Sequence, residues 1–139
     1  MKNEFIPFQQ ALELKELGFD EECLFAYYGK SDLSNFKESD YELCGDRHNS
    51  SFKEDGRVSA PLYQQVFRWF REKHNLYAVI IPTITMYWTF KTMTVVEGIF
   101  EVPPYNHVDG NDYPTYEEAE VESVKELIKI VKQQITKPE

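Results

Sequence analysis

The sequence predicts an α+β fold in which a small antiparallel sheet of three to four strands packs against two or three amphipathic helices. Three observations support this class. Apolar residues recur at helical spacing in three segments, β-branched and aromatic residues dominate residues 76–102, and cap or turn residues separate these regions. The length of 139 residues and the 42% share of hydrophobic residues suffice for one hydrophobic core. We therefore expect a single domain over residues 1–139.

The first predicted helix runs from about residue 7 to residue 17. Phe8 begins an i, i+3, i+4 pattern of apolar residues, and Pro7 suits a first helical turn. Gly18 suits the left-handed position that ends a helix, and Phe19 follows where an apolar residue often folds back on the last turn.

A short strand and a long polar loop are expected next. Residues 23–28 form an aromatic run between acidic residues and a glycine, which is typical of a strand. From about residue 29 to residue 58 the chain is rich in Ser, Asp, Asn, Gly and Lys, with Phe36, Tyr41 and Phe52 scattered without a period. Loops of this length are uncommon and are usually functional or disordered.

The second predicted helix opens at Ser59, whose side chain can accept an N-cap hydrogen bond, and Pro61 suits its first turn. The apolar face of this helix comprises Leu62, Val66, Phe67 and Phe70. His74 is interpreted as a cation near the last carbonyl groups, and Asn75 ends the helix.

Three antiparallel strands are expected between residues 76 and 102, because β-branched and aromatic residues predominate there. The predicted strands are 79–81, 87–96 and 99–102. Turns are expected at Pro82-Thr83 and Glu97-Gly98. Apolar residues occupy both faces of the middle strand, so we expect both faces to be partly covered.

The last predicted helix begins at Thr115, which forms a Thr-x-x-Glu capping box with Glu118. Its apolar stripe comprises Val121, Val124, Ile128, Val131 and Ile135. Glutamates crowd the first turns and lysines follow, an order that complements the helix dipole.

Charge and the length of the apolar stretches disfavour nucleic acid and the membrane as partners. A net charge of −9 and a pI of about 4.9 repel the phosphate backbone, so we expect no direct binding of nucleic acid. The longest apolar stretch is interrupted by Pro82 and is shorter than the roughly 20 residues of a membrane-spanning helix. The N-terminus lacks the pattern of a secretion signal, so we expect a cytoplasmic protein.

Two metal sites are suggested by spacing, and both are incomplete. Asp109, Asn111 and Glu120 match positions 1, 3 and 12 of a calcium-binding loop, but Pro114 stands where that loop needs a glycine. A turn followed by the start of a helix is the simpler interpretation.

Cysteine and histidine give the second incomplete pattern. Cys44 and His48 are spaced like half of a zinc site, with Cys23 and His107 as distant completions, but a second close pair is missing. A disulfide between Cys23 and Cys44 stays open, although the cytoplasm keeps thiols reduced. No base accompanies Cys23 in the sequence, and no Gly-rich phosphate loop is present. Together with the two incomplete metal patterns, this leads us to predict no catalytic residue, metal or cofactor.

A basic cluster is the candidate site for a partner. Arg68, Arg71 and Lys73 are expected on the outer face of the second helix, with Trp69 on its flank. A solvated helix face is the simplest interpretation, and the functional one is a docking patch for an acidic protein surface. Trp69 and Trp88 could also line a ligand groove, although such spacing is more typical of a core.

Three strings of the sequence stand out, namely PFQQALELKELGF at 7–19, APLYQQVFRWFREK at 60–73 and YEEAE at 116–120. In this order they resemble a family of short uncharacterised proteins of bacteriophages and prophages of gut-associated bacteria. The resemblance implies a phage-borne accessory protein in the bacterial cytoplasm, and it supplies no catalytic residues.

The leading hypothesis is therefore a non-enzymatic, phage-borne accessory protein that acts through protein–protein binding. Its sharper version is an acidic inhibitor that covers the nucleic-acid-binding surface of a host protein. One alternative is a small-ligand or enzymatic module with an aromatic-lined pocket. The other is a self-associating structural protein, a homodimer formed through an exposed sheet edge.

Overall fold

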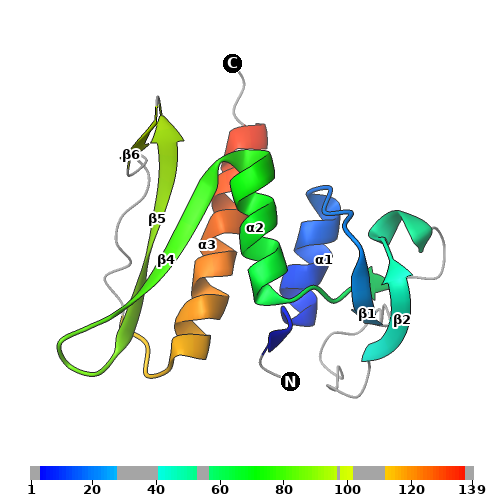
Figure 1. Ribbon diagram of the computed structural model, residues 1–139, viewed down its shortest axis with the longest axis horizontal. Coiled ribbons are helices and arrows are strands. Elements are labelled where there is room, and N and C mark those ends of the chain that lie inside the picture. Colours follow the sequence, from blue (N-terminus) through cyan, green and yellow to red (C-terminus); the bar gives the residue numbers. More distant parts are fainter. Residues whose placement is uncertain (1–3, 28–40, 53–56, 97, 102–111, 137–139) are drawn as a thin grey trace. The chain divides into compact units, whose positions relative to one another are not determined.

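The computed structural model describes residues 4–27, 41–52, 57–96, 98–101 and 112–136 (Figure 1). Its contacts divide the chain into two compact units, an N-terminal unit of residues 1–63 and a C-terminal unit of residues 64–139. The single domain over residues 1–139 stays a prediction.

The N-terminal unit contains one helix and one small antiparallel sheet. Its elements are α1 (Phe8–Glu16), β1 (Cys23–Tyr27), β2 (Tyr41–Arg47), the 3-10 turn η4 (Asn49–Ser51) and β3 (Val58–Ser59). The strand order is β2-β1-β3, with β1 in the centre. Tyr27 ties this sheet to the segment before α1, because its hydroxyl donates a 2.6 Å hydrogen bond to the carbonyl of Ile6.

The end of α1 confirms the sequence prediction. Gly18 has φ of 96°, a left-handed conformation that favours glycine. Its N–H donates to the Lys15 carbonyl at 3.1 Å, and the Phe19 N–H donates to the Leu14 carbonyl at 2.9 Å. This pair of bonds is the Schellman arrangement, and the buried Phe19 folds back on the helix as expected.

The loop predicted at 29–58 is wrong for part of its length, because β2, η4 and the start of β3 lie within it. Strand β2 forms through its backbone pairing with β1, which a search for local apolar periodicity does not detect. The side chain of the buried Asn49 also attaches this part of the chain to two distant segments. Its Nδ2 donates to the Phe19 carbonyl, and its Oδ1 accepts from the Ser59 N–H, both at 2.8 Å. The predicted loop residues 29–40 and 53–56, Phe36 among them, lie outside the described residues.

The C-terminal unit contains α2 (Tyr63–His74) from its second residue on, β4 (Leu76–Pro82), β5 (Trp88–Val96), β6 (Ile99–Glu101) and α3 (Tyr116–Thr136). The strands form an antiparallel sheet in the order β4-β5-β6, and α3 packs against β4 and β5 (Figure 1). The α+β class is therefore confirmed. The prediction of a single sheet of three to four strands is not confirmed, because the strands fall into two small sheets.

The start of α2 differs from the prediction. Ser59 lies in β3 rather than at an N-cap, and the helix begins four residues later, at Tyr63. Backbone pairing explains the difference: the Ala60 N–H donates to the Phe25 carbonyl at 2.8 Å, and Pro61 accepts from the Ile6 N–H at 2.9 Å. Because Ala60 and Pro61 form these bonds to other segments, they do not form the first helical turn that the sequence predicts.

The start of α3 matches the prediction more closely. Thr115 Oγ1 accepts a 3.1 Å hydrogen bond from the Glu118 N–H, which is the predicted cap. The buried stripe is wider than predicted, since Leu127 and Ile130 are also buried, whereas Ile135 is exposed. Across the described part of the chain, no helix combines the length and the apolar character needed to cross a membrane.

Candidate protein-binding surface

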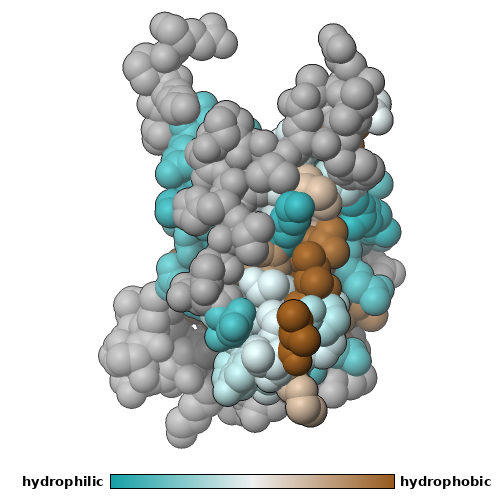
Figure 2. Space-filling view, turned by 90° about the vertical axis from the view of Figure 1, so that its left-hand side faces the viewer, coloured by the Kyte–Doolittle hydropathy of each residue, from teal (hydrophilic) through white to brown (hydrophobic). Residues whose placement is uncertain are grey.

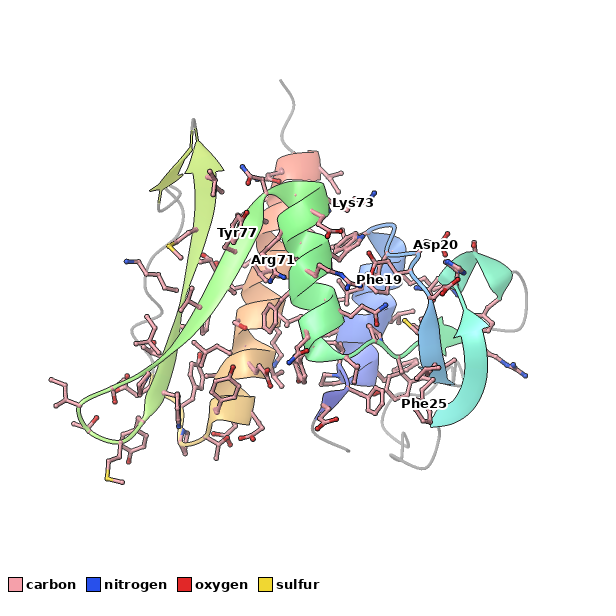
Figure 3. All side chains as sticks on the ribbon, in the orientation of Figure 1. Phe19, Asp20, Phe25, Arg71, Lys73 and Tyr77 are labelled. Atoms are coloured by element: carbon pink, nitrogen blue, oxygen red, sulfur yellow. The ribbon has the colours of Figure 1, made fainter. Side chains whose placement is uncertain are left out.

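The structure does not bring all three predicted basic residues together on one face of α2, because Lys73 lies apart from Arg68 and Arg71. Arg68, Arg71 and Lys73 are all exposed on α2. A helix turns by about 100° per residue, so Lys73 lies roughly 160° around the axis from Arg71. Figure 3 shows these two side chains on opposite sides of the helix. The role of the three cations in binding a partner stays a prediction.

Trp69 does not belong to this surface, because its side chain is only 3% exposed. Its ring contacts Phe70 at a centroid distance of 5.0 Å and His74 at 4.8 Å. Burial lowers the pKa of His74, which favours the neutral imidazole over the cation expected at the end of α2.

The predicted metal ligands are only partly within the described residues. Asp109, Asn111 and His107 lie outside them, as does the side chain of Cys44. Cys23 carries a buried thiol that donates to the Glu21 carbonyl at 3.5 Å. Among the described residues, no group of three His, Cys, Asp or Glu side chains could hold a metal ion.

The turn between β4 and β5 is the most unusual feature of the C-terminal unit. The Thr83 N–H donates to the Tyr87 carbonyl at 2.7 Å, and the Met86 N–H donates to the Thr83 carbonyl at 3.3 Å. Thr83 Oγ1 also accepts from the Tyr87 N–H at 3.1 Å. These bonds close a three-residue loop, Ile84-Thr85-Met86, whose last residue takes the left-handed conformation, with φ of 67° at Met86.

Glycine or asparagine normally fills that last position, because a left-handed conformation costs other residues about 1–2 kcal/mol. Here a methionine occupies it, and its side chain is 90% exposed, while Ile84 is fully exposed. Tyr87 beside them is exposed as well. Two apolar side chains of the loop therefore project into solvent, and one of them stands on a backbone position that disfavours it.

The sheet beside this turn has one buried face and one open face. Leu76, Phe90 and Thr92 alternate along the strands and are buried on the face that packs against α3. Val79 and Ile81 lie on the opposite face and are 41% and 38% exposed. We call the loop residues Ile84, Met86 and Tyr87, together with Val79 and Ile81, the hairpin surface.

The hairpin is also depleted of charge. Residues 76–96 contain a single charged residue, Lys91, in a chain whose charged residues make up 28% of the sequence. Figure 2, which looks at the sheet of the C-terminal unit, shows a band of apolar side chains beside paler and hydrophilic ones. Charged residues are depleted, and aromatic residues and methionine enriched, in the cores of protein interfaces. The hairpin shares this composition, and part of its low charge belongs to buried positions such as Leu76 and Phe90.

An aromatic cluster fixes the base of the turn to the start of α3. Trp88 and Tyr113 exchange two backbone hydrogen bonds, of 2.8 Å and 2.7 Å. The Trp88 ring meets Tyr116 edge-on at a centroid distance of 5.2 Å, and Phe90 stacks on Tyr113 at 6.2 Å. These contacts hold the protruding loop in place relative to the helix.

One carboxyl group near this cluster has an altered acidity. Burial, and then the negative charge of Glu117, raise the pKa of Glu120 to about 7. Burial and the same two glutamates also raise the pKa of Tyr116. Glu120 is therefore close to half-protonated near neutral pH.

Sequence reasoning did not single out the hairpin surface. Two signals in the sequence could have done so. One is the long run with a single charge, and the other is the connection between the predicted strands 79–81 and 87–96, which contains Ile84 and Met86 but no glycine or asparagine. Comparison of the chain with protein-family models, with curated proteins and with solved structures finds no match. The resemblance to phage proteins stays a prediction.

Proposed function

We propose that this chain is a non-enzymatic protein that acts by binding another protein, and that the hairpin surface makes the contact. The observation that carries the proposal is the full exposure of Ile84 and the 90% exposure of Met86 at the end of a hairpin. Apolar side chains that project from a surface can act as anchors in a pocket of a partner, where burial contributes most of the binding energy.

The rigidity of the hairpin supports this role. The loop is closed by three hydrogen bonds, and the Trp88–Tyr116 contact attaches its base to α3. A binding element that is already ordered loses less conformational entropy when it meets its partner. The left-handed conformation of Met86 supports the role too. Such a conformation lowers the stability of the fold, and residues that adopt it cluster at functional sites.

The sharper version is a phage-borne inhibitor that acts on a host protein in the bacterial cytoplasm. It is supported by the three resembling strings and by the net charge of −9. An acidic protein would be attracted to the basic surface of a nucleic-acid-binding protein, and this attraction would weaken in high salt.

A small-ligand or enzymatic module remains the alternative, and the aromatic residues Trp88, Tyr113 and Tyr116 are its support. Their rings pack on neighbouring rings rather than standing apart, which favours a structural role. A thermal-shift screen against metabolites and nucleotides tests this alternative, since a bound ligand raises the melting temperature.

The test of protein binding compares three forms of the tagged protein in captures from bacterial lysate, each at low and at high salt. The forms are the wild type, the double variant I84S/M86S and the control I135S, which removes an exposed isoleucine from the far end of α3. We expect the wild type and the control to retain the same partner in stoichiometric amount, and the double variant to lose it. Equal retention by all three forms would refute the role of the hairpin surface, and a capture that salt does not weaken would refute the acidic-inhibitor version.

A further inference from the structure

Strand β4 is an edge strand. Within the described residues its only strand partner is β5, and the pairing runs without interruption from Leu76 opposite Thr94 to Pro82 opposite Trp88. In a two-sided ladder each strand uses half of its backbone groups on each side. The backbone groups of β4 that point away from β5 therefore have no ladder among the described strands.

The burial of neighbouring residues places the middle of β4 at the margin of the packed face, although Leu76 at its start is buried. Ala78 lies opposite Thr92 and Ile80 lies opposite Phe90, all on the face that packs against α3. The two residues of β5 are buried, whereas the two residues of β4 are partly exposed. Since all four share one face, the difference reflects the position of β4 at the margin of the sheet.

The edge also lacks the features that usually protect such strands. Natural edges carry charged side chains, bulges or prolines that prevent pairing with another chain. The seven residues Leu76–Pro82 contain no charge, their register has no bulge, and the one proline stands at the last position. Strand β4 is thus a template for an added strand along most of its length.

The uncharged sequence of β4 makes β4 of a second copy a suitable added strand. Two copies of a chain with net charge −9 repel each other over most of their surface. The hairpin, with Lys91 as its one charged residue, is a region where two copies can approach without that repulsion. A strand that is apolar and uncharged is also complementary to itself when turned antiparallel.

We propose that β4 pairs antiparallel with β4 of a second copy around a two-fold axis near Val79, so that two small sheets join into one. Val79 is the middle residue of β4, and it would face its own counterpart across the axis. The two turns would then point to opposite ends of the joined sheet. The dimer would present two copies of Ile84 and Met86 for binding, which allows bivalent attachment.

The test measures molecular mass by sedimentation equilibrium from low to high micromolar concentration. We expect the wild type to rise from the chain mass of 16.4 kDa towards twice that value. V79K places two lysines opposite each other across the axis, each next to the Lys91 that pairs with residue 79 in its own copy. We expect it to raise the dimer dissociation constant about fivefold or more. The control T85K adds the same charge at the exposed turn and should dimerise like the wild type.

Two further measurements keep the outcome decisive. Circular dichroism shows whether V79K is folded, and I81K provides a second substitution on β4 if it is not. Amide hydrogen exchange of the wild type should slow in β4 as concentration rises, while exchange in the turn at Ile84 should not change. A wild-type mass of 16.4 kDa at every concentration, or dimerisation of folded V79K and I81K with the affinity of the wild type, would overturn the proposal. Dimerisation is independent of the partner proposed above, because I84S/M86S should still dimerise.

Discussion

The two faces of the β4–β5 sheet are built from similar residues but differ in what they do for the fold. Phe90 and Leu76 are buried on the face that packs against α3, whereas Val79 and Ile81 remain exposed on the opposite face. The removal of apolar surface from water is the main favourable contribution to folding. The covered face therefore stabilises the protein, and the open face contributes much less. The difference teaches that apolar composition alone does not identify a core.

The largest expected effect is on the covered face. We expect Phe90→Ala to lower the free energy of unfolding by about 3–5 kcal/mol, because it removes a buried aromatic ring and leaves a cavity. Ile81→Thr on the open face keeps a β-branched residue and should cost less than about 1 kcal/mol. Urea denaturation at low protein concentration measures both. Equal losses for the two variants would mean that the open face is covered in solution.

A gain in stability is expected at the turn. Met86→Gly relieves a left-handed conformation that costs about 1–2 kcal/mol, while the added freedom of glycine offsets part of that relief. We expect a net gain of about 0.5–1 kcal/mol in the free energy of unfolding, measured by thermal or urea denaturation. Lower stability in Met86→Gly would show instead that the methionine side chain packs within the fold.

A smaller, pH-dependent difference is expected at Glu120. Because its pKa is raised to about 7 in the folded protein, the folded state holds the proton more tightly than the unfolded state does. Its contribution to stability is therefore greatest below pH 4.5 and is lost as the pH rises through about 7. We expect Glu120→Gln to raise the melting temperature relative to the wild type at pH 8 and to leave it nearly unchanged at pH 4. An equal difference in melting temperature between variant and wild type at pH 4 and at pH 8 would show that a raised pKa of Glu120 is not its cause.

Local signals in the sequence predict the end of α1 and the start of α3. Gly18 and Thr115 each act within a few residues of their own position, and both have the predicted role. The sequence predicts a loop where β2 lies and a start of α2 at Ser59 instead of Tyr63, because both features depend on backbone pairing with distant segments. Asn49 illustrates this dependence on distant segments, since its side chain joins the carbonyl of Phe19 to the N–H of Ser59.

The candidate site could not be predicted for a related reason. The strands between residues 76 and 102 were expected, and β4, β5 and β6 confirm them. Which of their faces is buried depends on α3, whose residues follow much later in the chain. The basic residues of α2 were visible in the sequence, but the turn of the helix separates Lys73 from Arg71, and Trp69 is buried.

The central claim is that the exposed apolar residues of the turn are not needed for folding. The free energy of unfolding of I84S/M86S, compared with the wild type by urea denaturation at low protein concentration, tests it most directly. We predict a difference within about 0.5 kcal/mol, as for other exposed positions, or a slight gain. A loss of about 2 kcal/mol or more would contradict the claim, because it would place Ile84 and Met86 in the packing of the fold rather than on a surface that is available to a partner.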